Sequence, residues 1–343
     1  MLRYIIRRTV QAIPIFFGIT IFSYMLMSAA PGGPAAALAF DPRMSPQQRQ
    51  ILARQLGVDD PWPVQYVRWL IGDDWMLVID TTGDGVPDAP GNRQGILRGD
   101  FGNSFSARRP VLDVILERVP ATLELGSFAL LLGLSLGVPI GIISAVKRGS
   151  WFDNATRVMA VIFNAVPVFW LGLILILIFG SYLKLLPMGG RTPPILIGGT
   201  PPLYERLQYL ILPVIVLATG SIAGYSRYLR ASTLEVLGQD YIRTAMAKGL
   251  TNRRVYFIHA ARNALIPLAT FLGPAITGLL SGAVVTETIF SWPGLGRLGF
   301  RAVVEQDYPV VMAVVIISSI ATIVGYLLSD ILYALIDPRI RFG

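Results

Sequence analysis

The feature that most constrains the fold is a set of long stretches without any charged residue. Six such stretches occur, at residues 9–40, 125–146, 158–183, 207–226, 263–286 and 308–329. Each is long enough to cross the hydrocarbon core of a bilayer, which takes roughly 20 helical residues. The sequence therefore predicts an all-α integral membrane protein. We expect six transmembrane helices, near residues 9–30, 121–146, 158–183, 209–230, 264–285 and 310–335.

The basic residues predict which side of the membrane each connecting segment faces. Lys and Arg are most frequent in the segments 1–8, 147–157, 227–262 and 336–343, which share one side. By the positive-inside rule this side is cytoplasmic, and so are both termini. The same rule accounts for the net charge of +8, so we expect a lipid bilayer and no nucleic acid as the surroundings of the chain.

The first apolar run, residues 9–30, could instead be a cleaved signal peptide. It is longer than the core of roughly 7–15 residues that such peptides have, so a retained first span is favoured. The chain has no Cys and one His, which leaves no material for disulfides or for a thiolate or His-rich metal site.

The spacing of the predicted spans divides the chain into three parts. Residues 1–30 form a cytoplasmic tail and the first helix, and residues 31–118 an external subdomain. Residues 119–343 form the membrane core, with a cytoplasmic loop at 232–262. In the external part we expect a short helix at 45–56 and an amphipathic segment at 64–71, with Tyr66 and Trp69 at the membrane boundary.

Small residues recur on one face of the second predicted span. Gly133, Gly137 and Gly141 are spaced by four residues, and such a stripe lets two helices approach closely. Packing within this subunit is the favoured interpretation, and a contact between subunits is the alternative.

The cytoplasmic residues 240–267 combine two helix-forming stretches with a turn. Lys248 suits a helix C-terminus, Gly249 can adopt the left-handed conformation that ends a helix, and Thr251 or Asn252 can cap a second one. The apolar face of the second helix should comprise Val255, Ile258, Ala261 and Leu265. A capped basic helix pair suits docking to a cytosolic partner, although a solvated loop would carry the same charges.

Residues 240–267, hereafter the EAA segment, resemble the EAA loop of ABC importer permeases, in the form found in the dipeptide, oligopeptide and nickel branch. Arg243-Thr244-Ala245 stands where other permeases have Glu-Ala-Ala, and Gly249 follows four residues after Ala245. Further matches lie at residues 121–125, 287–296 and 337–341, so the resemblance covers nearly the whole chain. Residues 73–95 depart from the pattern and look like an insertion.

The resemblance implies a type I ABC importer permease architecture and a set of partners. These are a second, homologous permease subunit, two ATPase subunits that hold ATP and Mg²⁺, and an extracytoplasmic substrate-binding protein. The chain itself has no phosphate-binding Gly-x4-Gly-Lys-Ser/Thr loop, so neither catalytic residues nor a cofactor are expected in it. The EAA segment would form the helix that couples to an ATPase, through Asp240, Tyr241, Arg243, Thr244, Ala245, Lys248, Gly249, Leu250, Arg253, His259 and Arg262.

The function implied is the translocation of dipeptides or oligopeptides across the bacterial cytoplasmic membrane by alternating access. Nickel chelates, glutathione and oligosaccharides are alternative substrates within the same family. A stand-alone secondary transporter is a second class, but the sequence shows neither inverted repeats nor charges at span centres. An intramembrane enzyme would need a constellation of acids, His or Ser inside the spans, and the single His lies in a loop.

Polar side chains in or beside the spans are candidates for the translocation pathway. Glu124, Asn164 and Glu287 are the three that we single out. Glu124 could meet a peptide amine or could be a water-reaching carboxylate, and Asn164 could serve only to satisfy backbone groups near Pro167.

The insertion contains oxygen-bearing side chains at alternate positions around a glycine. Asp80, Thr82, Asp84 and Asp88 fit positions 1, 3, 5 and 9 of a Ca²⁺-binding loop, but Gly91 stands where such a loop has Glu. An acidic Gly/Pro turn is favoured over a Ca²⁺ site.

Overall fold

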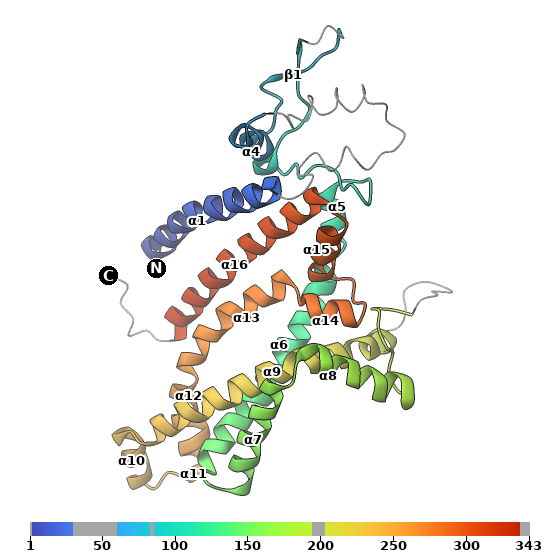
Figure 1. Ribbon diagram of the computed structural model, residues 1–343. Helices are drawn as coiled ribbons and strands as arrows, with labels where there is room; N and C mark the ends of the chain where they lie inside the picture. Colours follow the sequence, from blue (N-terminus) through green and yellow to red (C-terminus); the bar gives the residue numbers. More distant parts are fainter. Residues whose placement is uncertain (1, 30–59, 83–85, 194–202, 337–343) are drawn as a thin grey trace. The chain divides into compact units, whose positions relative to one another are not determined.

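The computed structural model describes residues 2–29, 60–82, 86–193 and 203–336, and this part of the chain is mostly helical (Figure 1). The predicted helix at 45–56 and the motif at 337–341 lie outside the described residues. The helices are α1 (Leu2–Ala29), α4 (Trp62–Ile71), α5 (Val111–Leu116), α6 (Val119–Val146), α7 (Trp151–Ala165), α8 (Val168–Leu175), α9 (Leu203–Leu237), α10 (Asp240–Ala247), α11 (Asn252–Arg254), α12 (Ala261–Ala264), α13 (Ala269–Ser281), α14 (Val284–Ile289), α15 (Leu295–Val304) and α16 (Tyr308–Ile336). One small antiparallel pair, β1 (Leu77–Ile79) and β2 (Ala89–Pro90), joins Leu77 to Pro90 and Ile79 to Ala89.

Four of these helical stretches are long and apolar enough to cross a membrane, and two bent helix pairs would raise the number to six. The four are Ile6–Ala29, Val111–Val146, Tyr204–Leu237 and Tyr308–Ile331. They coincide with the first, second, fourth and sixth spans predicted from the sequence. The chain is therefore a helical multi-pass membrane protein.

The third predicted span is not one straight helix. The helix begins earlier than predicted, at Trp151, and α7 meets α8 at an angle of 98°. Pro167 has no N–H to continue the helix, and the residue before a proline is pushed out of the helical region. Val166 accordingly has φ −75° and ψ 121°. Beyond α8 the chain continues as a π-helical stretch, Ile176–Tyr182.

The fifth predicted span is also broken. The segments Asn252–Leu268 and Gly273–Ile289 are bent by 59° relative to each other. A 3₁₀ turn at Ile266–Leu268 contains Pro267, and Gly282, with φ +81°, separates α13 from α14. A left-handed glycine cannot continue a right-handed helix, so the single helix expected at 264–285 is wrong.

Two compact units can be distinguished by their internal contacts. The larger unit comprises Met1–Ile5, Val119–Arg297 and Ala321–Gly343, and the smaller unit comprises Ile6–Arg118 and Leu298–Ile320. Each is described by itself below, within the described residues.

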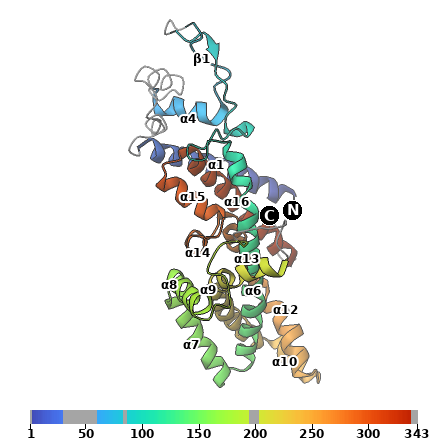
Figure 2. The same cartoon turned by 90° about the vertical axis from the view of Figure 1, so that its right-hand side faces the viewer.

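The core of the larger unit is the packing of α6 along α9 (Figure 2). Their close approach depends on the predicted glycine stripe. A Cβ at Gly141 would lie 2.7 Å from the Ser226 carbonyl oxygen, and one at Gly137 would lie 2.9 Å from Tyr225 Cβ. The favoured interpretation, packing within the subunit, is therefore confirmed.

The smaller unit has an aromatic core. Tyr24, Tyr66, Leu70 and Met312 are buried together, and the Tyr66 hydroxyl lies 2.9 Å from Thr20 Oγ1. Tyr66 is only 8% exposed, so its ring packs inside the protein, and its level relative to the membrane boundary stays a prediction. This face of α4 packs into the core because it carries Tyr66 and Trp69, whose rings contact the ring of Tyr24.

Residues 73–95, the segment expected to be an insertion, form in their described part a hairpin that is closed at its base. A Cβ on Gly95 would lie 2.2 Å from the Gly72 backbone nitrogen. The two ends of the hairpin can therefore approach this closely because both positions are glycine. Arg98 binds both carboxylate oxygens of Asp74 at 2.6 Å. These hydrogen bonds hold the pKa of Asp74 below its usual value.

Candidate functional site

The EAA segment folds as a helix, a tight turn and an irregular second helix. After α10 the chain turns at Gly249, whose φ of +77° confirms the predicted left-handed conformation. Thr251 occupies the N-cap position of α11, although its side chain makes no capping hydrogen bond. The second helix then runs through α11, a π-helical stretch at Val255–Ala260 and α12.

The apolar face of this second helix differs from the predicted one. Ile242, Val255 and Ala260 are fully buried and pack together with Val236 and Leu237 at the end of α9. Ile258 is 58% exposed, so its placement on the buried face is wrong. A π-helix closes its hydrogen bonds over five residues instead of four, and this stretch rotates Ile258 away from the face that α-helical spacing predicts.

Most of the candidate coupling residues are exposed on the surface of the EAA segment. Ala245 and Leu250 are half-buried. The Tyr241 hydroxyl accepts a hydrogen bond of 2.8 Å from Asn263 Nδ2, which joins α10 to the second helix. The exposed candidates are Asp240, Tyr241, Arg243, Thr244, Lys248, Gly249, Arg253, His259 and Arg262. Four of these nine exposed residues are Arg or Lys and one is Asp, so the exposed candidates are predominantly basic.

Glu287 lies at the opposite end of α13 from the EAA segment and is fully buried. Its Oε1 accepts hydrogen bonds from Thr122 Oγ1 at 3.1 Å and Ala283 N at 3.3 Å, and its Oε2 accepts one from Arg297 N at 2.8 Å. A Cβ at Gly294 would lie 2.3 Å from Oε1, which explains a glycine in this motif. The carboxylate thus organises the loop 282–297.

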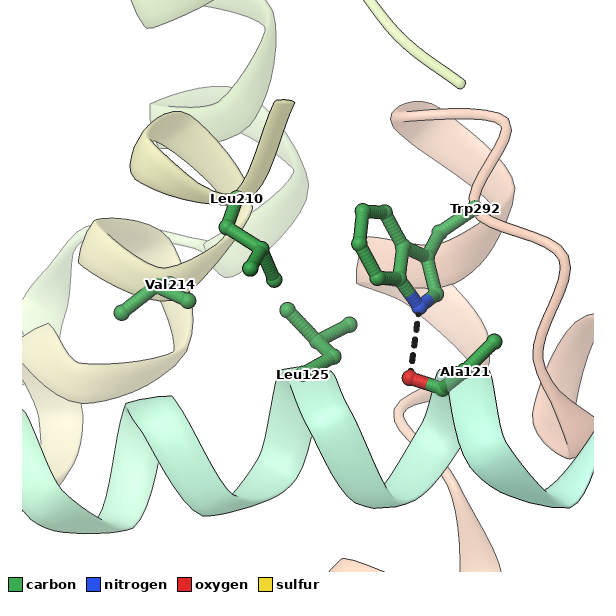
Figure 3. Close-up of a cluster of buried hydrophobic side chains, with 5 residues drawn as sticks. All are labelled: Ala121, Leu125, Leu210, Val214 and Trp292. Carbon is green, nitrogen blue, oxygen red and sulfur yellow. Dashed lines mark hydrogen bonds between the residues drawn. The ribbon is translucent and has the colours of Figure 1, made fainter. Parts of the chain in front are cut away.

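Trp292 holds the same loop against α6 and α9 (Figure 3). Its indole N–H donates a hydrogen bond of 2.8 Å to the Ala121 carbonyl oxygen. Its ring is buried among Leu125, Leu210 and Val214. Because Leu295 N also donates to Thr122 Oγ1 at 2.7 Å, motifs 121–125 and 287–296 form one structure.

A cavity of about 450 Å³ lies between α6, α9 and α13. Small or apolar side chains make up most of its wall, and Thr122 and Glu287 are among the lining residues. Polar groups on the wall also include Ser221 and Tyr225. A cavity of this kind can accommodate a small ligand.

The other two candidate pathway residues lie elsewhere. Glu124, 18% exposed, forms ion pairs with Arg191 at 2.6 Å and Arg206 at 3.2 Å. Asn164 is exposed near the end of α7, and its amide donates to the Ala160 carbonyl oxygen at 2.7 Å. The structure therefore does not bring Glu124, Asn164 and Glu287 into one site.

The predicted Ca²⁺ loop is only partly described, because Asp84 lies outside the described residues. Both carboxylate oxygens of Asp88 accept hydrogen bonds from Thr81, at 2.9 Å from its N–H and 2.7 Å from its hydroxyl. These bonds lower the pKa of Asp88. Among the described residues no group of three or more His, Asp or Glu could hold a metal ion.

A buried ion pair between Asp153 and Arg230 was not predicted from the sequence. Asp153 is 1% exposed and follows Ser150, whose Oγ accepts a hydrogen bond from Asp153 N at 3.3 Å. Ser-x-x-Asp before an apolar run is a helix-start signal. This signal could have identified Asp153 as the first turn of α7, but its partner on α9 was not visible in the sequence.

The long apolar helices, the buried Glu287 and the cavity beside it define a multi-pass membrane component. The chain matches the family model "Binding-protein-dependent transport system inner membrane component" over residues 137–342, and the N-terminal model of the same transport systems over residues 1–126. The chain therefore belongs to the family of inner membrane components of binding-protein-dependent transport systems.

Relatives with known names support the same assignment over the full length. The oligopeptide transport system permease protein AppB of Bacillus subtilis is 41% identical over 343 residues, which is 100% of both chains. The dipeptide transport system permease protein DppB of Escherichia coli K12 is 38% identical over 359 aligned positions, with 99% of each chain covered.

One solved structure shares the fold. A chain of the MetNI methionine ABC transporter, solved in inward-facing conformations, aligns with a TM-score of 0.53 and 17% identity. The alignment covers 66% of this chain and 97% of the other. At this identity the likeness concerns the fold alone.

Proposed function

We propose that this chain is the permease subunit of an ABC importer that moves dipeptides or oligopeptides across the bacterial cytoplasmic membrane. The observation that carries the proposal is full-length identity of 41% and 38% to two proteins named as peptide permeases. The match extends over 100% of this chain for the first protein and 99% for the second. A nickel chelate, glutathione or an oligosaccharide is the alternative cargo.

The mechanism is alternating access with an external motor. A related second permease completes the pathway, two ATPase subunits that hold ATP and Mg²⁺ bind on the cytosolic side, and a substrate-binding protein docks outside. The EAA segment offers a suitable ATPase contact, because its exposed basic side chains stand on a turn fixed by Gly249 and on a buried apolar core. With each bent pair counted as one span, the proposed topology has six spans and leaves both termini in the cytosol.

The natural absence of Cys makes the orientation and the ATPase contact directly testable. Met246→Cys introduces a thiol at an exposed position of α10, and Val86→Cys introduces one at an exposed position of the hairpin. We expect a membrane-impermeant maleimide to label intact cells at residue 86 only. A cleavable thiol crosslinker should join residue 246, and not residue 86, to an ATP-hydrolysing subunit.

Labelling of residue 246 from outside would refute the orientation. Crosslinks from residue 246 that never include an ATPase would refute the coupling role. Either result would leave the chain in its family but remove the motor from the mechanism.

The substrate is tested by uptake in cells that depend on this transporter. A strain lacking the chain should fail to take up a labelled dipeptide or tripeptide, and the wild-type gene should restore uptake. Nickel chelate, glutathione and an oligosaccharide serve as parallel cargoes. Restoration of only one of these, with no restoration of peptide uptake, would overturn the peptide assignment.

Within the pathway, the cavity beside Glu287 is the proposed place where cargo passes. Thr122, Ser221 and Tyr225 offer hydrogen-bonding groups there, while Glu287 holds the wall in shape. Glu124 is proposed to influence entry through its two arginine partners, and Asn164 to stabilise the bend before α8. Replacing Ser221 by Ala should alter the uptake KM, whereas Ser135→Ala, at an exposed position of α6, should not.

The hairpin is proposed to bind no Ca²⁺ under ordinary conditions. The carboxylate of Asp88 already accepts two hydrogen bonds from Thr81, and Asp80 accepts from Thr82 Oγ1 at 3.3 Å. Calorimetry of the whole chain in detergent with millimolar Ca²⁺ should give no heat beyond that of an Asp80→Asn variant. A difference between the two would favour a Ca²⁺ site completed by Asp84.

A further inference from the structure

A buried carboxylate ties three helices together near the EAA segment. Asp153 Oδ1 accepts hydrogen bonds from Arg230 Nε at 2.5 Å and Ser144 Oγ at 2.6 Å. Its Oδ2 accepts from Arg230 Nη2 at 2.8 Å and from Gly149 N at 2.9 Å. The Asp153 side chain thereby joins the end of α6, the first turn of α7 and the C-terminal half of α9.

The same end of α9 carries the EAA segment. Val236 and Leu237 pack into the apolar core of that segment around Val255, and Ser232 Oγ donates to the Ala264 carbonyl oxygen at 3.0 Å. Figures 1 and 2 show α7, α10 and α12 gathered around this end of α9. A displacement of the EAA segment must therefore pull on the part of α9 that holds Arg230.

At its other end α7 leads to the sharper of the two bends that interrupt candidate spans. Val166 and Pro167 interrupt the backbone hydrogen bonding, and α8 departs at 98°. A helix interrupted at one point bends there more readily than in its hydrogen-bonded body. The ion pair and the bend thus lie at opposite ends of α7.

A buried ion pair contributes little net stability to the contact between two helices. Desolvation offsets much of the attraction, and apolar residues of similar volume often stabilise a protein as well or better. The bidentate contact of Arg230 with Asp153 instead specifies one geometry, because both hydrogen bonds form in a single position of α7. The pair therefore fits a role in transmitting position better than a role in stability alone.

We propose that Asp153 and Arg230 are positioning residues that make the EAA segment, the C-terminal half of α9 and α7 move as one body. When this body is displaced, the chain bends at Val166–Pro167. This proposal rests on the proposed function for the source of the displacement. The rigid link itself is a property of the chain and can be measured without any ATPase.

The first experiment measures the link in the isolated chain, in lipid nanodiscs. Spin labels at Met246→Cys and Trp151→Cys occupy exposed positions on α10 and at the start of α7, and electron–electron double resonance gives their distance distribution. We expect one narrow distribution, which Asp153→Asn broadens and the exposed control Glu235→Gln leaves unchanged. Equal widths in all three would overturn the proposal.

The second experiment uses the complete transporter. Asp153→Asn should lower peptide uptake about tenfold more than ATP hydrolysis, because loss of one charge-assisted hydrogen bond weakens the link by at least a power of ten. Arg230→Lys keeps the positive charge but cannot form the bidentate contact, so its ratio of uptake to ATP hydrolysis should lie between those of the wild type and Asp153→Asn. The same variant tests the proposal if Asp153→Asn fails to fold.

A fall of uptake and hydrolysis in equal proportion, matching the amount of assembled complex, would mean that the pair only stabilises the fold and would overturn the proposal. Failure of the wild-type chain to assemble with an ATPase would instead overturn the proposed function. The label distances would still decide whether the rigid link exists.

Discussion

Substitution of Gly141 by Ala tests how closely α6 and α9 approach each other. The added methyl carbon would lie 2.7 Å from the Ser226 carbonyl oxygen and 2.8 Å from Leu229 Cβ. Carbon–carbon contacts are most favourable at about 3.5–4.0 Å, and a radial gap of about 0.5–1 Å forfeits a quarter to a half of a contact's attraction. The helices must therefore move apart, and neighbouring contacts are weakened with them.

The expected cost can be isolated with a matched glycine on α9. Overpacking typically costs about 1–3 kcal/mol, while Gly→Ala within a helix contributes a gain of roughly 0.5–1 kcal/mol. A Cβ added at Gly224 would meet no atom within 4 Å, so Gly224→Ala should show the gain alone. The difference in unfolding free energy between the two variants should therefore be about 1–3 kcal/mol.

The assay is thermal unfolding of the purified chain in detergent, followed by tryptophan fluorescence. Gly133→Ala should lie between the extremes, because its nearest neighbour is the Ser221 side chain at 3.0 Å and not backbone. Equal melting temperatures for Gly141→Ala and Gly224→Ala would refute the close helix contact. A larger loss at Gly133 than at Gly141 would refute the register of the two helices.

Three further predictions concern the EAA segment and the hairpin. Gly249→Ala meets no atom within 4 Å but must keep a φ of +77°, so it should cost about 1–2 kcal/mol and lower uptake at unchanged amounts of chain in the membrane. Val255→Asn buries an amide without a partner, so it should lower the stability of the isolated chain by about 1–3 kcal/mol and with it the melting temperature. Ile258→Asn places the amide at an exposed position and should leave the melting temperature unchanged. A larger loss of stability for Ile258→Asn than for Val255→Asn would contradict the π-helical register. The lowered pKa of Asp88 means that its contribution to the hairpin is present above the ordinary value of 3.8 and is lost as the pH falls through the folded-state pKa; cleavage of the hairpin by pepsin should accelerate over that acid range in the wild type and depend less on pH in Asp88→Asn.

Much of the architecture follows from local chemistry. An apolar run such as 125–146 can satisfy its backbone groups in lipid only as a helix, so its presence alone predicts a span. Gly249 is similar, because a glycine after Lys248 at the end of a helix-forming stretch indicates a left-handed turn whatever surrounds it. The glycine stripe on α6 likewise indicated a close helix contact before its partner was known.

The candidate sites were predicted less well, because their partners are distant in the sequence. Glu287 was expected beside the pathway from its type and place, yet its role depends on Thr122 and on the N–H of Arg297. Ile258 was misplaced because hydrophobic spacing assumes α-helical geometry, and the π-helical turn is stabilised by packing against α9.

By itself the sequence determined the class of fold, the positions of four of the spans and the turn at Gly249, because these depend on hydrophobicity and backbone preference within a few residues. Only the tertiary structure decided the 98° angle between α7 and α8, which face of α4 is buried and that Asp153 meets Arg230. Such features depend on which distant segments pack together, and buried charges gain a partner only when two elements have already been brought into contact.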